Sequence, residues 1–324
     1  MPQHHPTRRR LLQAGILGLL SSALPTAMSA ARASAVARTA LDPASTAEQA
    51  TQGIDLSGKT IVVTGCNSGI GLETMRVLAL RGAHVIGTAR SREKGEAACT
   101  SIRGKATPLV LDLADFDSVV VCANQVLALA PQLDGLICNA GIVLGDLEQV
   151  DGLEKQFVVN HLGHYLLTRR LLDRLIAAPQ GRVVVLGSGE HRNAPPGGIQ
   201  VGRLWGASWR DRGYSHSKLA NGLFSLELSQ QLAGTPATSN CATPGHVRSN
   251  ILRNVGNGYR DDARSVQQGA ATPSWLASSP TLASVSGGYF RDFAEAEQSE
   301  QQRDRAMAHR LWQVSETLVA KHLA

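Results

Sequence analysis

The sequence predicts an α/β fold with a doubly wound parallel sheet in a single domain. Short continuous apolar runs, suited to buried parallel strands, alternate along the chain with longer segments of helical apolar spacing. A glycine-rich turn joins the first of these strands to the helix that follows it. The chain has 324 residues, of which 43% are hydrophobic, and this is enough to bury the core of one such domain.

The N-terminal segment has the layout of an export signal. Three arginines at positions 8–10 precede a mild apolar run over residues 11–24, and small residues suited to cleavage follow. This layout resembles the bacterial twin-arginine signal. We therefore expect a twin-arginine-type signal over residues 1–35, a linker over 36–54 and the folded domain over 55–324. The export machinery would then be a partner and the protein periplasmic or otherwise exported. The alternative is that the apolar run is retained as a membrane anchor.

The composition argues against several classes of function. The net charge is +6, but five arginines precede the first acidic residue, Asp42, so the basic balance does not indicate a nucleic-acid partner. His161 and His164 lie three residues apart, yet no acidic residue or cysteine stands at ligand spacing, so we expect no metal site. The cysteines are odd in number and lack a CxxC pair, so we interpret them as small, mostly buried residues. They are Cys66, Cys99, Cys122, Cys138 and Cys241.

The glycine turn follows the first predicted strand, residues 60–63. Glycines let backbone N–H groups approach a pyrophosphate, and the helix predicted after the turn, up to Leu80, directs its positive dipole end toward that anion. A second strand over 84–88, about twenty residues on, completes the pattern of a dinucleotide site. The residues that this turn contributes are Gly65, Asn67, Ser68, Gly69, Ile70 and Gly71.

The end of the second strand indicates which dinucleotide binds. An acidic residue there would bind the ribose 2′-hydroxyl and repel a 2′-phosphate, but the strand ends without one, at Arg90. An arginine can pair with a phosphate. We therefore expect NADP(H) in preference to NAD(H). The alternative is a surface arginine that pairs with Glu93 or Glu96.

Three further strands are predicted over residues 108–113, 135–138 and 182–186, separated by helices over 115–130 and 150–178. Ligands bind at the carboxyl ends of parallel strands, so residues at these ends are expected to share one site. They are Asp112, Leu113, Asn139, Ala140, Gly141 and Ser188, and the long helix carries Asn160.

Asp112 has two interpretations. At the carboxyl end of its strand it is placed to accept a hydrogen bond from an adenine amino group. It can instead cap the helix that follows.

Tyr214 and Lys218 stand four residues apart, on one face of a helix predicted to reach Leu232. A phenol has a pKa near ~10, and a nearby ammonium lowers that pKa. Such a pair can exchange a proton with an alcohol or a carbonyl. The alternative is a tyrosine packed on the core beside a lysine whose stem lies along it.

In their order along the chain, these motifs resemble the short-chain dehydrogenase/reductase family, whose fold is a Rossmann-type sheet. The resemblance covers roughly residues 55–318. Three segments resemble more narrowly the retinol dehydrogenase and WW-domain oxidoreductase branch: Asn160-His-Leu-Gly-His-Tyr165, Tyr214-Ser-His-Ser-Lys-Leu-Ala-Asn221 and Ser286-Gly-Gly-Tyr-Phe-Arg-Asp292. This chain departs from the family pattern at Cys138, where the family often has an asparagine.

The resemblance implies an NAD(P)-dependent oxidoreductase acting on CH–OH groups. Tyr214 would be the general acid/base, and Lys218 would lower its pKa and bind the nicotinamide ribose. Ser188 would hold the substrate oxygen, and Asn160 would help to place a water and Lys218 in a proton relay. The resemblance adds a cofactor-binding loop and a mobile segment over the substrate, residues 246–275. The loop residues are Pro244, Gly245 and Val247.

The expected function is therefore hydride transfer between NADP(H) and a small or lipophilic alcohol, aldehyde or ketone. The alternative is a non-catalytic dinucleotide-binding sensor or scaffold of the same fold. The family commonly pairs subunits through its long helices, so a homodimer is one expected assembly.

Two further segments are expected to frame the site. The insertion over residues 189–213 carries Trp205 and Trp209, which either line a pocket or pin the loop. A C-terminal helix over about 300–320 is expected to dock on the body through apolar residues at helical spacing. These are Met307, Leu311, Val314 and Leu318.

Overall fold

The computed structural model describes residues 41–256 and 258–323, so the predicted signal segment lies outside the described residues. Their central element is a sheet of eight strands in the order β10-β9-β8-β7-β4-β1-β2-β3. The strands are parallel except β10, which runs antiparallel to β9. Their bounds are β1 Thr60–Val63, β2 His84–Ala89, β3 Lys105–Val110, β4 Gly135–Cys138, β7 Arg182–Leu186, β8 Thr238–Ala242, β9 Tyr289–Arg291 and β10 Ala294–Glu295.

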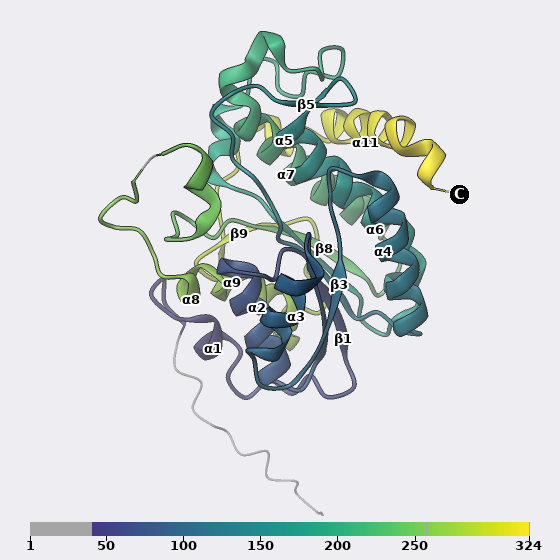
Figure 1. Ribbon diagram of the computed structural model, residues 1–324, viewed down its shortest axis with the longest axis vertical. Helices are drawn as coiled ribbons and strands as arrows, with labels where there is room; N and C mark the ends of the chain where they lie inside the picture. Colours follow the sequence, from purple (N-terminus) through teal and green to yellow (C-terminus); the bar gives the residue numbers. More distant parts are fainter. Residues whose placement is uncertain (1–40, 257, 324) are drawn as a thin grey trace, which may run out of the picture. The chain divides into compact units, whose positions relative to one another are not determined.

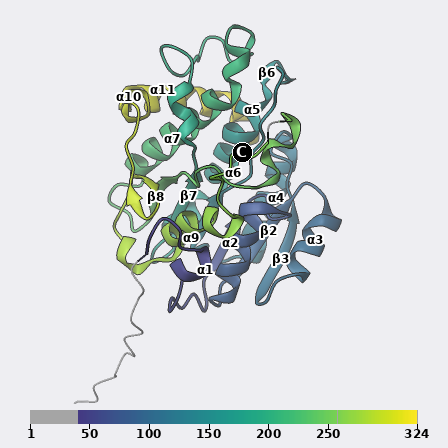
Figure 2. The same ribbon diagram turned by 90° about the vertical axis from the view of Figure 1, so that its left-hand side faces the viewer.

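Helices cover both faces of the sheet (Figures 1 and 2). Alternation along the strands sends side chains to two separate cores: in β1, Val62 joins one core, while Ile61 and Val63 join the other. This arrangement confirms the doubly wound α/β fold. The first core is covered by α4 (Phe116–Leu129), α6 (Gly163–Ala177), α7 (Gly213–Gln231) and α11 (Arg305–Val319). The second is covered by α1 (Ala47–Ala50), α2 (Gly69–Leu80), α3 (Arg92–Thr100) and α9 (Ala271–Ser278).

Four of the five predicted strands lie where the apolar runs placed them, with β2 one residue longer than expected. The third is different: β3 ends at Val110, so Asp112 and Leu113 follow the strand rather than end it. The reason is the register with β2, whose last residue, Ala89, pairs with Val110. Beyond that pair, the Asp112 side chain turns the chain by accepting from the backbone N–H of Ala114 at 2.9 Å.

The long helix predicted over residues 150–178 begins later, at α5 (Lys155–Phe157). Before it the chain forms a hairpin of β5 (Gln149–Val150) and β6 (Leu153–Glu154), whose turn residues Asp151 and Gly152 have φ of 49° and 77°. Helical backbone excludes such angles. Between α5 and α6 lies a π-helical turn, η1 (Val158–Leu162), which carries Asn160.

Residues 41–54 fold onto the domain, which corrects the prediction of a linker over 36–54 within the described part. Thr46 and Gln49 form a capping box at the start of α1. Ala47 is fully buried, and α1 contacts α9. A short helix needs only a small apolar face, here Ala47 and Ala50, to dock on the domain. Because alanine is common in linkers as well as in helices, the sequence alone did not predict this docking.

The C-terminal helix docks as predicted. Met307 and Leu311 are buried in the first core, and Val314 and Leu318 pack against it. Arg169 on α6 also pairs with Glu316 at 2.8 Å. The shorter helices are α8 (Val266–Gly269), α10 (Glu300–Arg303), η2 (Gly189–Asn193), η3 (Ala207–Arg212), η4 (Asn250–Asn254), η5 (Pro280–Leu282) and η6 (Ala320–His322). Within the described ranges, no helix has the length and apolar character to span a membrane.

We predict that Ala47→Glu destabilises the protein, because the new carboxylate would be buried against α9 without a partner. The free energy of unfolding in urea should fall by at least about 1 kcal/mol. Gln52→Glu, at an exposed position beyond the same helix, is the matched control and should change it by less than about 0.5 kcal/mol. Equal effects of the two variants would contradict the docking of α1.

Candidate active site

The glycine turn forms a backbone cradle at the start of α2. Gly65 and Gly69 have φ of 72° and 59°, a region that favours glycine. A Cβ on Gly71 would lie 2.3 Å from the carbonyl oxygen of Gly65, so no side chain fits there. Ser68 precedes α2 without capping it through its side chain, which leaves the first N–H groups of the helix without a side-chain acceptor. These features fit a dinucleotide pyrophosphate.

A second turn, Asn139-Ala140-Gly141, interlocks with the first. The Thr64 hydroxyl accepts from the backbone N–H groups of Asn139 and Ala140 at 3.0 and 2.9 Å. The Asn139 amide donates to the carbonyl of Thr64 at 2.7 Å. A Cβ on Gly65 would lie 3.0 Å from Ala140. The ends of β1 and β4 are therefore fixed to each other by three hydrogen bonds.

Lys218 lies beneath these turns on α7. Its side chain is 3% exposed, and its Nζ donates to the carbonyl of Leu186, the last residue of β7, at 2.9 Å. Asn221, one turn further on, donates to the same carbonyl at 2.9 Å. Burial lowers the pKa of Lys218 to about 8.

Tyr214 lies one turn before Lys218 and is half-buried. Burial raises the pKa of its phenol to about 12, although a hydrogen bond with the side chain of Ser188 opposes this rise. The expectation that Lys218 lowers the phenol pKa stays a prediction, and burial acts on that pKa in the opposite direction. The Nζ of Lys218 is 5.6 Å from the centroid of the Tyr214 ring and bonds to Leu186 instead.

Asn160, in the π-helical turn, reaches the segment that follows the second turn. Its Oδ1 accepts from the backbone N–H of Ile142 at 2.8 Å, and its Nδ2 donates to the carbonyl of Ile142 at 3.0 Å and to Ser217 Oγ at 2.9 Å. A Cβ on Gly141 would lie 3.3 Å from Asn160 Oδ1 and 3.7 Å from Lys218 Nζ. Asn160 and Lys218 therefore both lie close to Gly141. The side-chain amide of Asn160 holds the backbone of Ile142 in place.

The residues predicted to hold the adenosine half lie beside the glycine turn. Cys66 donates its backbone N–H to Thr88 at 2.8 Å, which ties the turn to the end of β2, just before Arg90. Arg90 is exposed and makes no ion pair with any described residue, while Glu96 pairs with Arg92 at 3.7 Å instead. Arg90 therefore forms no ion pair with Glu93 or Glu96, so the alternative of a paired surface arginine is not supported.

Asp112 does not cap the helix that follows it. Asp115 caps α4, accepting from the backbone N–H groups of its first turn at 3.0 and 3.2 Å. Leu113 is buried in the first core, and its backbone carbonyl lies against Gly163.

The loop after β8 returns to the glycine turn. Gly245 has φ of 75°, and the side chain of Arg264, which pairs with Asp292, lies 3.5 Å from the place of a Gly245 Cβ. Val247 forms a β-bridge with Arg264, and both Val247 and Ile70 lie against Gly269. Pro244, which precedes Gly245, is half-buried.

The segment after Val247 continues across the site. The place of a Gly69 Cβ is 3.4 Å from Ser249, which the sequence did not single out. At its far end, Asn254 donates to the carbonyl of Val143 at 3.3 Å. The segment therefore spans from the glycine turn to the chain that follows Gly141.

Two further side chains, Gln156 and His191, hold backbone groups of the site in place. Gln156 accepts from the backbone N–H of Leu144 at 3.0 Å, one turn before Asn160. His191 bonds the carbonyl of Ser188 at 2.7 Å and accepts from the N–H of Ser299 at 3.2 Å. The only signal in the sequence was spacing, since Gln156 and Asn160 are four residues apart on one helix face.

The insertion before α7 is pinned by Trp209, which stacks on His216 with ring centroids 4.0 Å apart, while Trp205 is exposed. His161 and His164 bond Ser315 and Thr64, at 2.8 Å in both cases. No cluster of three metal-ligand side chains occurs among the residues that the structure describes. The five cysteines are free, and four of them are buried.

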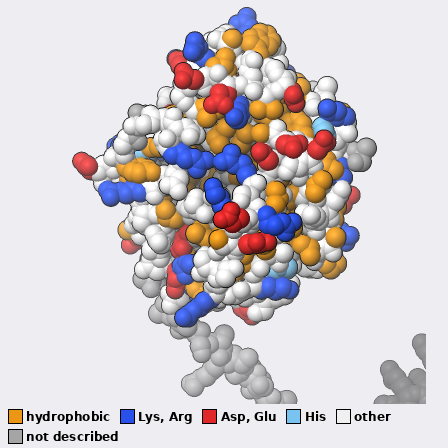
Figure 3. Space-filling view, in the orientation of Figure 1, with side chains coloured by type: hydrophobic (Ala, Val, Ile, Leu, Met, Phe, Trp, Pro, Cys, Tyr) orange, Lys and Arg blue, Asp and Glu red, His pale blue; other side chains and the backbone are white. Residues whose placement is uncertain are grey.

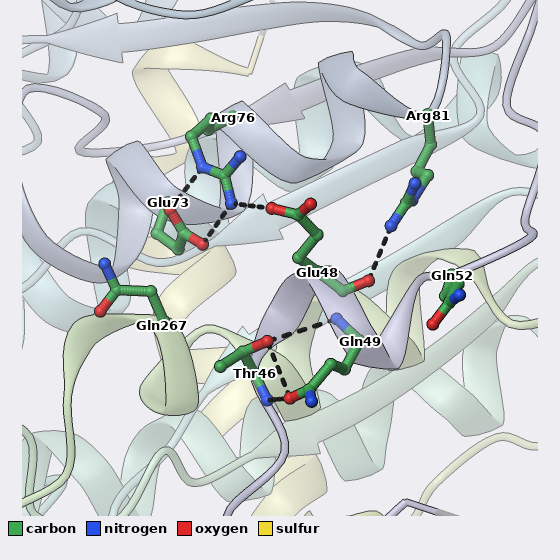
Figure 4. Close-up of a pocket in the computed structure, with 8 residues that line it drawn as sticks. All are labelled: Thr46, Glu48, Gln49, Gln52, Glu73, Arg76, Arg81 and Gln267. Atoms are coloured by element: carbon green, nitrogen blue, oxygen red, sulfur yellow. Dashed lines mark hydrogen bonds and ion pairs between the residues drawn. The ribbon is translucent and has the colours of Figure 1, made fainter. Parts of the chain in front are cut away.

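A hollow of about 570 Å³ lies apart from this site, between α1 and α2 (Figure 4). Its charged groups satisfy one another: Arg76 pairs with Glu73 and Glu48, at 2.8 Å each, and Arg81 donates to the carbonyl of Glu48. The two carboxylates and Arg76 are therefore paired, while Arg81 bonds two neutral oxygens, the hydroxyl of Thr51 and the carbonyl of Glu48. Lys and Arg side chains gather instead near the middle of the face drawn in Figure 3, over the region between α7 and α2.

Comparison with known proteins decides the family. The family model of the short chain dehydrogenases matches residues 59–260. The chain belongs to the short-chain dehydrogenase/reductase family. It is 40% identical to retinol dehydrogenase 12 of Bos taurus over 276 residues, which are 81% of this chain and 86% of that protein. It is 37% identical to the WW domain-containing oxidoreductase of Homo sapiens over 302 residues, 87% of this chain and 73% of that protein.

A solved structure from Mycobacterium paratuberculosis, of a protein described as uncharacterized, is similar to this short-chain dehydrogenase with a TM-score of 0.70. The two are 33% identical, and the similarity covers 84% of this chain and 97% of that one. The comparisons confirm the family and the retinol dehydrogenase-like branch.

We predict that Lys218→Met stabilises this short-chain dehydrogenase at pH 7. Because the folded pKa is about 8 against an ordinary 10.5, the unfolded state binds more protons between these values, and stability rises with pH across that window. Below pH 8 the buried charge costs about 3 kcal/mol. The lost hydrogen bond offsets about 1 kcal/mol, since Asn221 still donates to the carbonyl of Leu186.

Urea unfolding should therefore show the variant about 2 kcal/mol more stable at pH 7. The difference should vanish near about pH 10 and reverse above it, where only the lost hydrogen bond of about 1 kcal/mol remains. The exposed Lys105, replaced by Met, is the control and should change stability by less than about 0.5 kcal/mol at either pH. A Lys218→Met protein that is less stable than the wild type at pH 7 would contradict the charge burial argued here.

Proposed function

We propose that this chain transfers a hydride between NADP(H) and an alcohol or carbonyl substrate. The observation that carries the proposal is the gathering of four groups at the carboxyl edge of the sheet. The side chain of Ser188 is near enough to Tyr214 to lower its phenol pKa, and Asn160 Oδ1 and Lys218 Nζ both lie within 3.7 Å of the place of a Gly141 Cβ. The glycine cradle beside them fits the pyrophosphate of a dinucleotide. When bound, the nicotinamide supplies or accepts the hydride.

In the reducing direction, the protein must stabilise oxyanion charge and deliver one proton. Ser188, whose side chain acts on the pKa of Tyr214, forms with it a pair of neighbouring hydroxyls that hold one substrate oxygen. A phenol with a pKa of about 12 is fully protonated near neutral pH, so Tyr214 is ready to donate its proton. Lys218, with a pKa of about 8, is placed to bind a ribose hydroxyl beside Gly141.

The proposed substrate is small or lipophilic, because apolar side chains border the site. The half-buried Ile142, Val143 and Leu144 follow the second turn, and Asn160 and Gln156 hold their backbone. From the other side, η4 brings Val255 to within 3.8 Å of the place of a Gly145 Cβ. Two apolar edges that face each other favour an apolar substrate body.

NADP(H) is proposed over NAD(H) because Arg90 is exposed, lacks an ion pair among the described residues and directly follows β2. The 2′-phosphate of NADP(H) is a dianion that a guanidinium binds with two parallel hydrogen bonds. Export through the twin-arginine route, with a periplasmic location, and assembly as a homodimer also remain proposals.

We predict that Tyr214→Phe lowers kcat for NADPH-dependent reduction of aldehydes at least about 1,000-fold, because the variant has no hydroxyl to donate the proton. NADPH binding, measured by fluorescence, should stay within threefold. Tyr165→Phe is the matched control: Tyr165 is buried and bonds Glu316 away from the site, and its loss should leave kcat within about twofold.

Retained turnover in Tyr214→Phe would exclude the proposed acid/base role. A wild-type protein that binds NADPH but reduces or oxidises nothing in a broad panel would favour the sensor or scaffold.

We predict that Arg90→Ala raises the KM for NADPH at least about tenfold, the value of one charged hydrogen-bonded pair, and changes the KM for NADH less than twofold. Steady-state kinetics with both cofactors measures this. Arg103→Ala, an exposed arginine beyond α3, is the control and should change neither value. An NADH preference of the wild type would contradict the assignment of Arg90.

A further inference from the structure

We infer that His164 is a positioning residue that joins the two halves of the active site. It lies on α6, outside contact with any residue proposed to touch the substrate. Its ring connects the Thr64 hydroxyl, at 2.8 Å, with the backbone carbonyl of Asn160, at 3.1 Å. The inference deepens the proposed hydride transfer and rests on it for its kinetic part.

The hydrogen-bond capacity of Thr64 fixes the roles of the two ring nitrogens. A hydroxyl has one proton and two lone pairs. Both lone pairs of Thr64 Oγ1 are taken by the N–H groups of Asn139 and Ala140, at 3.0 and 2.9 Å. Only the proton remains, and His164 Nε2 at 2.8 Å is a far better acceptor for it than the carbonyl of Ile137 at 3.4 Å.

Nε2 of His164 is therefore unprotonated, and Nδ1 carries the hydrogen. Nδ1–H then donates to the carbonyl of Asn160 in the π-helical turn. Both ring nitrogens are satisfied only in this neutral tautomer. The ring is 1% exposed, and its burial, together with the charge of Lys218, lowers its pKa to about 4, so that it stays neutral at physiological pH.

These hydrogen bonds form a closed network around the second turn, Asn139-Ala140-Gly141. Thr64 holds the turn at Asn139 and Ala140, and Asn160 holds it at Ile142. His164 connects these two anchors. Gly141 lies in the middle of the held segment, and the place of its Cβ is 3.7 Å from Lys218 Nζ. His164 therefore helps to fix the turn, including Gly141, against which the ammonium of Lys218 lies.

The bonds of His164 do not reach the part of the site that would hold the adenosine and the pyrophosphate. The glycine cradle, Arg90 and Asp112 reach their places through β1, β2 and the segment after β3. A loss of His164 should thus disturb the catalytic end of the cofactor site and leave the adenosine and pyrophosphate end intact. Turnover and nucleotide affinity are then expected to respond differently.

His164→Leu removes both bonds, and His161→Leu is the matched control. His161 lies on the same helical stretch, is also 1% exposed and bonds Ser315 on the far side from the site. We expect His164→Leu to lower kcat at least tenfold, with the dissociation constant of NADPH within threefold. His161→Leu should lower the unfolding temperature by a similar amount but keep kcat within twofold. His164→Gln, which keeps an acceptor near Nε2, should recover part of the lost kcat.

Two measurements keep the inference testable if His164→Leu folds poorly or the wild type shows no turnover. Thr64→Val removes the same link from the other side, together with the two bonds that the hydroxyl accepts from the N–H groups of Asn139 and Ala140. The His164→Gln/Thr64→Val double variant should therefore lose no more kcat than Thr64→Val alone. Amide hydrogen exchange needs no turnover: residues 139–142 should exchange faster in His164→Gln and Thr64→Val, but not in His161→Leu. Equal exchange in all three proteins, or equal kcat losses in His164→Leu and His161→Leu, would overturn the positioning role.

Discussion

A buried ammonium constrains this active site more than any other group. Taking the charge of Lys218 out of water costs several kcal/mol, and no carboxylate among the described residues pairs with it. The carbonyl of Leu186 offsets part of that cost, and it also accepts from Asn221. With both lone pairs filled from α7, the end of β7 is fixed to that helix at two points. Ser188, two residues beyond Leu186, therefore keeps a constant relation to Tyr214.

The other polar groups of the site obey the same rule, that a buried donor or acceptor must find a partner. Asn160 uses its whole amide to hold Ile142 and Ser217, and Thr64 uses every position of its hydroxyl. A site built in this way cannot adjust one group without leaving another unsatisfied. Such a network favours one fixed geometry, which is the condition for electrostatic preorganisation.

The sequence predicted those parts of the fold that depend on local pattern. Continuous apolar runs predicted β1, β4 and β7 at their observed bounds, since most parallel strands that are buried on both faces are apolar throughout. It did not predict β8, residues 238–242, which is buried but polar. There Asn240 bonds the carbonyl of Val285 and the N–H of Gly288, and Ser239 bonds Ser225. Partners distant in the chain make this strand possible, and no local pattern records them.

In the candidate site, too, local sequence pattern predicted some features, while others depend on contacts between distant parts of the chain. Residue types at strand ends indicated which side chains meet, because parallel strands present their carboxyl ends at one edge. The proton affinity of Tyr214 depended on two things that spacing does not contain: how deeply the ring is buried and where the ammonium of Lys218 points. A lysine one helical turn away lowers a phenol pKa only if its charge faces the phenol oxygen. Here the ammonium donates to the backbone carbonyl of Leu186, and burial of the tyrosine raises its pKa, so the phenol keeps its proton at neutral pH.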